Sequence, residues 1–237
     1  MTLLSLEGVS KRYRHGSRER LALRDVTMSV AAGEVVVVLG TRRSGRSTLM
    51  RIAAGLERSD EGRVRFRDAA LGVRSGVVGR QLCYCLTSFS SMEGDRVLDH
   101  VGAPLLACGA SRRVSRERAF RALERVEIEQ LAALTPDELD GSERIRVAIA
   151  RALAPEPLLL VIDDPTAPAG TLQRDPLLRL LRSLPGTGGP SVLMCTDDGM
   201  CVSGAERLLL LDDGELRTQV DTPQAEVVPL NARRAGA

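Results

Sequence analysis

Residues 40–48, GTRRSGRST, carry the pattern in this chain that most directly implies chemistry. The pattern G-x-x-x-x-G-K-[S/T] uses glycines to let backbone N–H groups approach a triphosphate, a lysine to reach the outer phosphates and a hydroxyl to hold Mg²⁺. Here an arginine stands at the lysine position. The stretch therefore predicts a phosphate-binding loop with an altered cation, and its nucleotide-binding candidates are Gly40, Arg43, Ser44, Gly45, Arg46, Ser47 and Thr48.

The elements around this loop have the order that a phosphate-binding loop requires. AAGEVVVVLG, residues 31–40, is a turn followed by a continuous apolar run, which suits a strand buried on both faces. Residues 49–56 then show the apolar spacing of a helix, which meets Gly55 near its end. Strand, glycine-bounded loop and helix together make the motif a serious indication of nucleotide binding.

Alternating apolar residues predict two further strands, at 2–10 and 22–30. From about residue 95 to 155 the apolar spacing becomes helical, and one of these helices, over 115–128, is expected to have Ser115 as its N-cap. This region predicts a helical insertion.

LLLVIDDPT, residues 158–166, predicts a short apolar strand that ends in two carboxylates, Asp163 and Asp164. Beyond it we expect a helix at about 171–183, a strand at 191–196 and a closing hairpin at 207–216. Helices that alternate with strands in this order predict an α/β fold with a helical subdomain.

The composition limits the classes of function. A chain of 237 residues with 43% hydrophobic content can bury a substantial core. Lys+Arg at 33 against Asp+Glu at 31 gives a net charge of +2, which is too small to indicate a nucleic-acid partner. No run approaches the roughly 20 apolar residues of a membrane helix, so we expect any membrane role to come through a partner.

The cysteines give no sign of a metal or disulfide framework. They are odd in number and lack paired zinc spacing, so reduced thiols in a cytosol fit best. The five are Cys83, Cys85, Cys108, Cys195 and Cys201.

A phosphate loop, a helical insertion and an apolar strand ending in carboxylates together resemble the ATP-binding subunit of an ABC transporter. The likeness runs from LEGVSKRY to LLLLDDGEL, and RVAIARAL followed by LLLVIDDPT carries it most strongly. The phrase VLDHVGAPLL is most similar to the branch that serves lipoprotein release, macrolide export and cell division.

The resemblance implies an α/β fold with a P-loop NTPase core of the ABC ATPase type, an antiparallel β subdomain and a helical signature subdomain. It implies one ATP-binding domain over 1–222, with the helical subdomain inserted at about 88–155, and we expect a flexible tail over 223–237.

The resemblance also implies ligands and partners. ATP would lie between the phosphate loop of one subunit and the signature segment of a second, with Tyr13 stacked on adenine; the alternative for Tyr13 is a half-buried strand tyrosine. Ser47 and Asp163 would hold Mg²⁺. The partners would be a membrane-spanning permease and a second ABC subunit, at the cytoplasmic face of the cell membrane.

Several positions depart from the family pattern near the phosphates. Arg46 replaces the lysine and is bulkier and planar, so nucleotide binding is expected to weaken; a harmless exchange remains the alternative, because Lys11 is the only lysine. Arg43 stands where glycine is usual. Thr87 replaces the glutamine of the lid segment and is too short to be a sure Mg²⁺ ligand.

The family signature leucine-serine-glycine-glycine-glutamine is here LDGSE, residues 139–143. Its trans-acting candidates are Asp140, Gly141, Ser142 and Glu143. A carboxylate at the serine position would repel a γ-phosphate held by the partner subunit. The alternative is purely structural, since Asp140 with Glu143 makes a capping box for the following helix.

The catalytic positions also differ. Asp164 stands at the general-base glutamate and is one methylene shorter, and Asp197 stands at the histidine that senses the γ-phosphate. Gly170 replaces the aspartate of the loop that communicates across the dimer.

Three functions follow from these departures. The first is a catalytically degenerate ABC subunit that serves a competent subunit or a membrane protein. The second is a slow ATPase with Asp164 as base. The third is a nucleotide-free interaction module in which Arg46 pairs with Asp163, Asp164 or Asp197.

Overall fold

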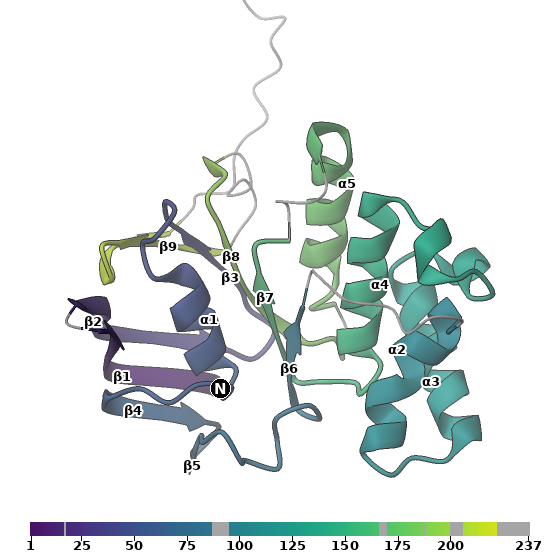
Figure 1. Cartoon of the computed structure of the whole chain (residues 1–237), viewed down its shortest axis with the longest axis horizontal. Helices are drawn as coiled ribbons and strands as arrows, with labels where there is room; N and C mark the ends of the chain where they lie inside the picture. Colours follow the sequence, from purple (N-terminus) through teal and green to yellow (C-terminus); the bar gives the residue numbers. More distant parts are fainter. Residues whose placement is uncertain (17, 87–94, 166–169, 187, 200–205, 222–237) are drawn as a thin grey trace, which may run out of the picture.

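The computed structural model describes residues 1–16, 18–86, 95–165, 170–186, 188–199 and 206–221. In this part of the chain, an antiparallel sheet and a mostly parallel sheet lie on one side and a group of helices on the other (Figure 1). The predicted α/β fold is confirmed.

The antiparallel sheet has the strand order β2-β1-β4-β5. Its long strands are those that the alternating apolar residues predicted, although both extend further than expected. Two shorter strands, which the sequence did not reveal, complete the antiparallel sheet. The strands are β1 (Thr2–His15), β2 (Arg18–Ala31), β4 (Glu61–Phe66) and β5 (Ala69–Ala70).

The second sheet has the order β10-β9-β3-β8-β7-β6. From β9 to β6 all neighbours are parallel, whereas β10 pairs with β9 as the expected antiparallel hairpin. The strands are β3 (Val35–Leu39), β6 (Leu82–Cys85), β7 (Leu159–Asp163), β8 (Ser191–Thr196), β9 (Arg207–Asp212) and β10 (Glu215–Asp221).

The continuous apolar strands are explained by two cores, one on each face of the parallel sheet. On β3, Val36 and Val38 pack with the antiparallel sheet and α1, whereas Val35 and Val37 pack with the other helices. Side chains alternate between the faces of a strand, so a strand covered on both sides needs apolar residues at every position.

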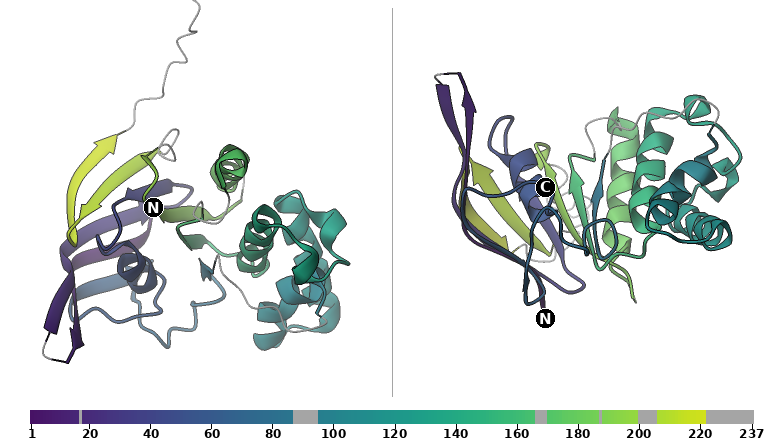
Figure 2. Two further views of the ribbon diagram at one scale, coloured as in Figure 1. Left: turned by 45° about the horizontal axis from the view of Figure 1, so that its top comes forward. Right: turned by 60° about the horizontal axis from the view of Figure 1, so that its bottom comes forward.

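Five α-helices lie in the described residues. Helix α1 packs against the face that β1 and β2 cover, whereas α2 to α5 cover the opposite face (Figure 2). They are α1 (Arg46–Ala53), α2 (Val97–Ala107), α3 (Arg112–Arg125), α4 (Gly141–Leu153) and α5 (Gly170–Ser183), with two short 3₁₀ turns, Glu129–Leu131 and Pro136–Glu138.

The prediction that Ser115 caps a helix is wrong. Helix α3 begins four residues earlier, because Ser111 Oγ accepts a hydrogen bond of 3.3 Å from the backbone N–H of Val114. Ser115 is buried inside the helix and donates from Oγ to the Gly102 carbonyl at 2.9 Å. Its hydroxyl therefore joins α3 to α2 instead of starting α3.

Among the described residues, no helix is long and apolar enough to cross a membrane. Thr87 and the predicted tail at 223–237 lie outside the described residues.

Candidate nucleotide-binding site

The candidate site lies at the carboxyl ends of three neighbouring parallel strands, β3, β8 and β7. The loop leaves β3 at Gly40, whose N–H donates to the Thr196 carbonyl at 3.1 Å. Asp164 follows β7, and its N–H donates to the Cys195 carbonyl at 3.1 Å. In open α/β sheets, ligands bind beyond the carboxyl ends of the strands, so the fold itself assembles these residues.

Two glycines of the loop are required by close backbone approach. A Cβ on Gly45, which has a φ of 105°, would lie 2.3 Å from the Ala22 carbonyl oxygen of β2. A Cβ on Gly40 would lie 2.5 Å from Ser44 Oγ and 2.6 Å from the Leu211 carbonyl oxygen. The loop is therefore pressed between β2 and β9, and only glycine fits at both positions.

Arg43 adopts the left-handed conformation that glycine favours, with a φ of 68°. Its carbonyl oxygen accepts a hydrogen bond from the guanidinium of Arg20 on β2. An arginine at this position therefore keeps the backbone shape of a glycine and adds a cation to the rim of the loop.

A cavity of about 310 Å³ opens beside the loop and is walled on one side by Tyr13 of β1. The Tyr13 hydroxyl donates to Glu57 Oε1 at 2.6 Å, accepts from Arg51 at 3.1 Å and lies 3.3 Å from Thr48 Oγ1. These contacts hold the ring against the loop while leaving Tyr13 37% exposed. The ring can therefore offer a stacking surface at the cavity.

Arg46 is held by two aspartates from other strand ends. Its Nη1 lies 3.6 Å from Asp164 Oδ2, and its Nη2 lies 3.5 Å from Asp197 Oδ2. The Arg46 side chain is only 10% exposed, whereas those of Asp164 and Asp197 are 23% and 42% exposed. Arg46 is thus paired with two carboxylates that follow β7 and β8.

The Asp163 carboxylate accepts hydrogen bonds on both oxygens. Tyr84 Oη of β6 donates to Oδ2 at 3.1 Å, and Cys195 Sγ of β8 donates to Oδ1 at 3.0 Å. Burial and the neighbouring carboxylate raise the pKa of Tyr84 and of Cys195 well above their usual ranges. Both groups therefore keep their protons and act as donors.

The candidate Mg²⁺ residues Ser47 and Asp163 lie at the start of α1 and at the end of β7. Ser47 is exposed at the start of α1, but the oxygens of Asp163 already accept from protein donors. In the described part of the chain, no group of three His, Cys, Asp or Glu side chains is arranged to hold a metal ion. Asp163 is thus held in place by hydrogen bonds from the two strands beside β7.

The signature-like residues lie apart from this cluster within the chain. Asp140 is the N-cap of α4; its Oδ1 accepts from the Glu143 N–H at 2.8 Å, and Glu143 Oε2 accepts from the Asp140 N–H at 2.8 Å. Gly141 and Ser142 form the first turn of α4, which packs on the face of the sheet opposite α1. Gly170 begins α5.

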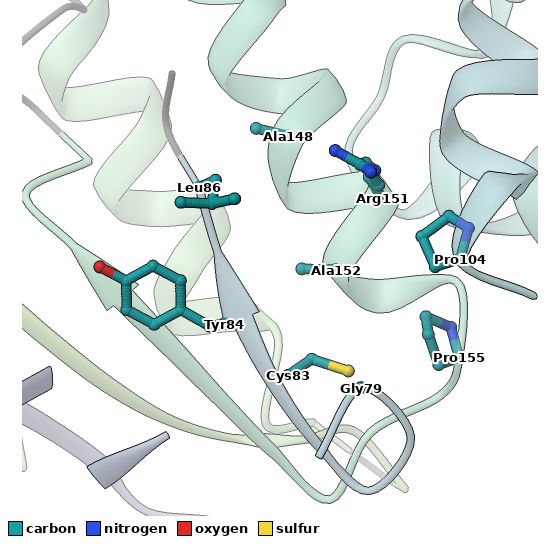
Figure 3. A pocket seen from close by; sticks show the side chains of 9 residues that line it. All are labelled: Gly79, Cys83, Tyr84, Leu86, Pro104, Ala148, Arg151, Ala152 and Pro155. Carbon is teal, nitrogen blue, oxygen red and sulfur yellow. The ribbon is translucent and has the colours of Figure 1, made fainter. Parts of the chain in front are cut away.

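Sequence reasoning missed Tyr84 and Cys195 as partners of Asp163. Cys195 stands opposite Asp163 in the register of β7 and β8, and Tyr84 pairs with Val161, two residues before Asp163. The three side chains share one face because their strands are in this register. Figure 3 shows that Tyr84 projects from β6 on the side opposite Cys83.

Comparisons with known proteins agree with this geometry. Residues 23–167 match the family model described as ABC transporter. The lipoprotein-releasing system ATP-binding protein LolD of Chromohalobacter salexigens is 33% identical over 225 residues, covering 90% of this chain and 92% of LolD. The macrolide export ATP-binding/permease protein MacB of Nitrobacter winogradskyi is 31% identical over 90% of this chain but 34% of its own length.

Solved structures give the same result. The ATP-binding cassette MJ0796, solved as a dimer bound to ADP and Pi, superposes with a TM-score of 0.83 at 28% identity, over 92% of this chain and 98% of the cassette. CbiO1 from Clostridium perfringens has the same fold, with a TM-score of 0.80 at 24% identity over 93% of this chain and 88% of its own. The chain belongs to the ABC transporter family and has the fold of its ATP-binding cassettes.

Proposed function

We propose that this chain is the ATP-binding subunit of an ABC transporter-like complex and that its catalytic machinery is degenerate. It serves as a structural or regulatory partner of a membrane-spanning permease, of a competent second ATP-binding subunit, or of both. Its relatives in lipoprotein release and macrolide export, one of them fused to a permease, support this assignment. The subunit would lie at the cytoplasmic face of the membrane, held there by the permease.

The observation that carries the proposal is the pairing of Arg46 with Asp164 and Asp197. In an active site of this family the corresponding groups would all face the γ-phosphate. Here they contact one another, and the two carboxylates repel an incoming phosphate at short range. ATP must therefore displace two ion pairs to reach Arg46, which lowers its affinity and leaves Asp164 poorly placed to act as a base.

The signature-like segment supports the same conclusion for a partner's nucleotide. Asp140 and Glu143 place two carboxylates at the start of α4, where the family offers a hydroxyl and a helix N-terminus to a phosphate. A second ATP-binding subunit paired with this chain is therefore expected to turn over slowly at both composite sites.

The same ion pairs favour a second candidate, a nucleotide-free scaffold. Arg46 already has counter-ions, so the loop does not require a phosphate to neutralise its most buried cation. The third candidate, a slow ATPase, requires Asp164 to leave Arg46 and activate water.

One titration separates the three candidates. The purified chain is titrated with a fluorescent ATP analogue with and without Mg²⁺, and turnover is measured on the same sample beside Asp164→Asn. Binding without turnover supports the degenerate subunit. Turnover that Asp164→Asn abolishes would establish the slow ATPase instead. If the analogue neither binds nor raises the melting temperature, the chain is the scaffold, because a ligand that binds only the folded state must stabilise it.

A further inference from the structure

Asp163 ends β7 at the position to which the family resemblance assigns Mg²⁺, and the two strands beside β7 supply its hydrogen-bond donors. Tyr84 Oη lies 3.1 Å from Oδ2 and Cys195 Sγ lies 3.0 Å from Oδ1. Cys195 is fully buried, and Tyr84 is half-buried in β6 and packs against the same hydrophobic cluster that contains Cys195. The hydrogen-bonding directions of this carboxylate are thus set by the protein.

The donor–acceptor direction of these hydrogen bonds matters for metal binding. A carboxylate that holds a cation through water accepts hydrogen bonds from the metal-bound water molecules. At Asp163 both oxygens accept hydrogen bonds from protein side chains, Oδ2 from Tyr84 Oη and Oδ1 from Cys195 Sγ. The phenol and the thiol therefore supply what metal-bound water would otherwise donate.

We propose that Tyr84 and Cys195 form a clamp on Asp163 that takes the place of a hydrated divalent cation. The clamp occupies one acceptor site on each oxygen of the carboxylate and fixes its orientation, so the water of an approaching cation must compete with fixed donors at Asp163. This inference rests on the proposed nucleotide site, since the cation would arrive with the phosphates. Its consequence is a nucleotide affinity that depends little on Mg²⁺.

The test compares nucleotide affinity in excess EDTA with that in excess Mg²⁺. For the wild-type chain we expect the two dissociation constants of a fluorescent ATP analogue to differ by no more than about threefold. Tyr84→Phe/Cys195→Ala removes two hydrogen bonds to a charged group. In this variant the ratio of the dissociation constant in EDTA to that in Mg²⁺ should therefore rise at least about tenfold above the wild-type ratio. Cys195→Ser keeps a donor and should behave as wild type.

Two outcomes overturn the clamp. An unchanged Mg²⁺ dependence in the double variant means that the donors do not compete with the cation. A reduced dependence means that they orient Asp163 for metal binding. If the double variant does not fold, Tyr84→Phe alone preserves the ring and should show a smaller increase of the same sign.

The clamp and the proposed function can fail separately. Binding of the analogue in EDTA tests the nucleotide site without any metal. If that binding is absent, the proposed function fails, and Mn²⁺ binding to the nucleotide-free chain, followed by electron paramagnetic resonance, tests the clamp: the double variant should bind Mn²⁺ more tightly than wild type, and equal or weaker binding contradicts it.

Discussion

The phosphate loop and the signature-like segment both place charges where the family pattern has other residues, but the charges are satisfied in different ways. Asp140 and Glu143 bond to each other's backbone across three residues of one helix start. Arg46 instead contacts Asp164 and Asp197, which follow two other strands.

Because of this difference, the two regions should contribute differently to the stability of the chain and to its affinity for ATP. A local capping box stabilises its own helix whatever happens elsewhere in the chain. Ion pairs that join three elements around a cavity compete directly with any ligand that enters it. Substitutions in the signature-like segment should therefore change the stability of the isolated chain, whereas substitutions around Arg46 should also change its affinity for ATP.

The largest effect is expected at Gly45, where the loop is pressed against β2. Gly45→Ala should lower the free energy of unfolding by about 3 kcal/mol, because a Cβ would meet the Ala22 carbonyl oxygen at 2.3 Å. Gly33→Ala is the matched control: Gly33 also has a positive φ, of 77°, but a Cβ there contacts nothing, so about 1 kcal/mol is expected. Equal losses in urea unfolding would show that close approach to β2 does not matter.

Removing Arg46 should have the next largest effect on stability. Arg46→Ala removes the cation that contacts both Asp164 and Asp197, so we expect a loss of about 2 kcal/mol, about 1 kcal/mol for each ion pair. Arg42→Ala, in the same loop but exposed, should change the free energy of unfolding by less than about 0.5 kcal/mol. Chemical denaturation measures both, and similar values would mean that the ion pairs contribute nothing to the folded loop.

The signature-like segment predicts a smaller and purely structural effect. Asp140→Ala should cost about 1 kcal/mol, which lowers the melting temperature by about 2–4 °C. Asp140→Ala/Glu143→Ala should cost little more than either single change, because the two residues share one capping box. The ATP affinity of the isolated chain should stay the same; a weaker affinity in Asp140→Ala would break the separation between the two regions.

The smallest effect is expected at Arg43. Arg43→Gly removes a side chain from a left-handed backbone position with a φ of 68° and should stabilise the chain by about 0.5 kcal/mol. Calorimetric melting of the two proteins measures the difference. A lower melting temperature in the variant would show that the arginine side chain, and not only its backbone, holds the loop.

The sequence predicts what depends on near neighbours and misses what depends on strand register. The glycine loop, the alternating strands and the Asp140 cap were predicted because each is decided within a few residues. Ser115 was misplaced because Ser111, four residues earlier, competes for the same role. The hydrogen bonds of Tyr84 and Cys195 to Asp163 arise from the pairing of three strands, which no local pattern reveals.

The ion pairs of Arg46 were predictable from the sequence only in part. Pairing of Arg46 with Asp163, Asp164 or Asp197 was one of the sequence-based alternatives. Which aspartates pair with it depends on the order β3-β8-β7 and on the positive φ of 49° at Asp164, which turns the chain after β7.

The most direct test measures the ATP affinity of the wild-type chain, of Asp164→Asn/Asp197→Asn and of the control Asp68→Asn, which removes one carboxylate from an exposed residue between β4 and β5. Calorimetric titration with metal-free ATP gives the three dissociation constants under one salt condition. If the ion pairs of Arg46 with Asp164 and Asp197 compete with ATP, removing both carboxylates should lower the dissociation constant at least about tenfold, because each ion pair is worth about 1 kcal/mol. The dissociation constant of Asp68→Asn should remain near that of wild type. Equal or weaker binding by the double variant would contradict the account.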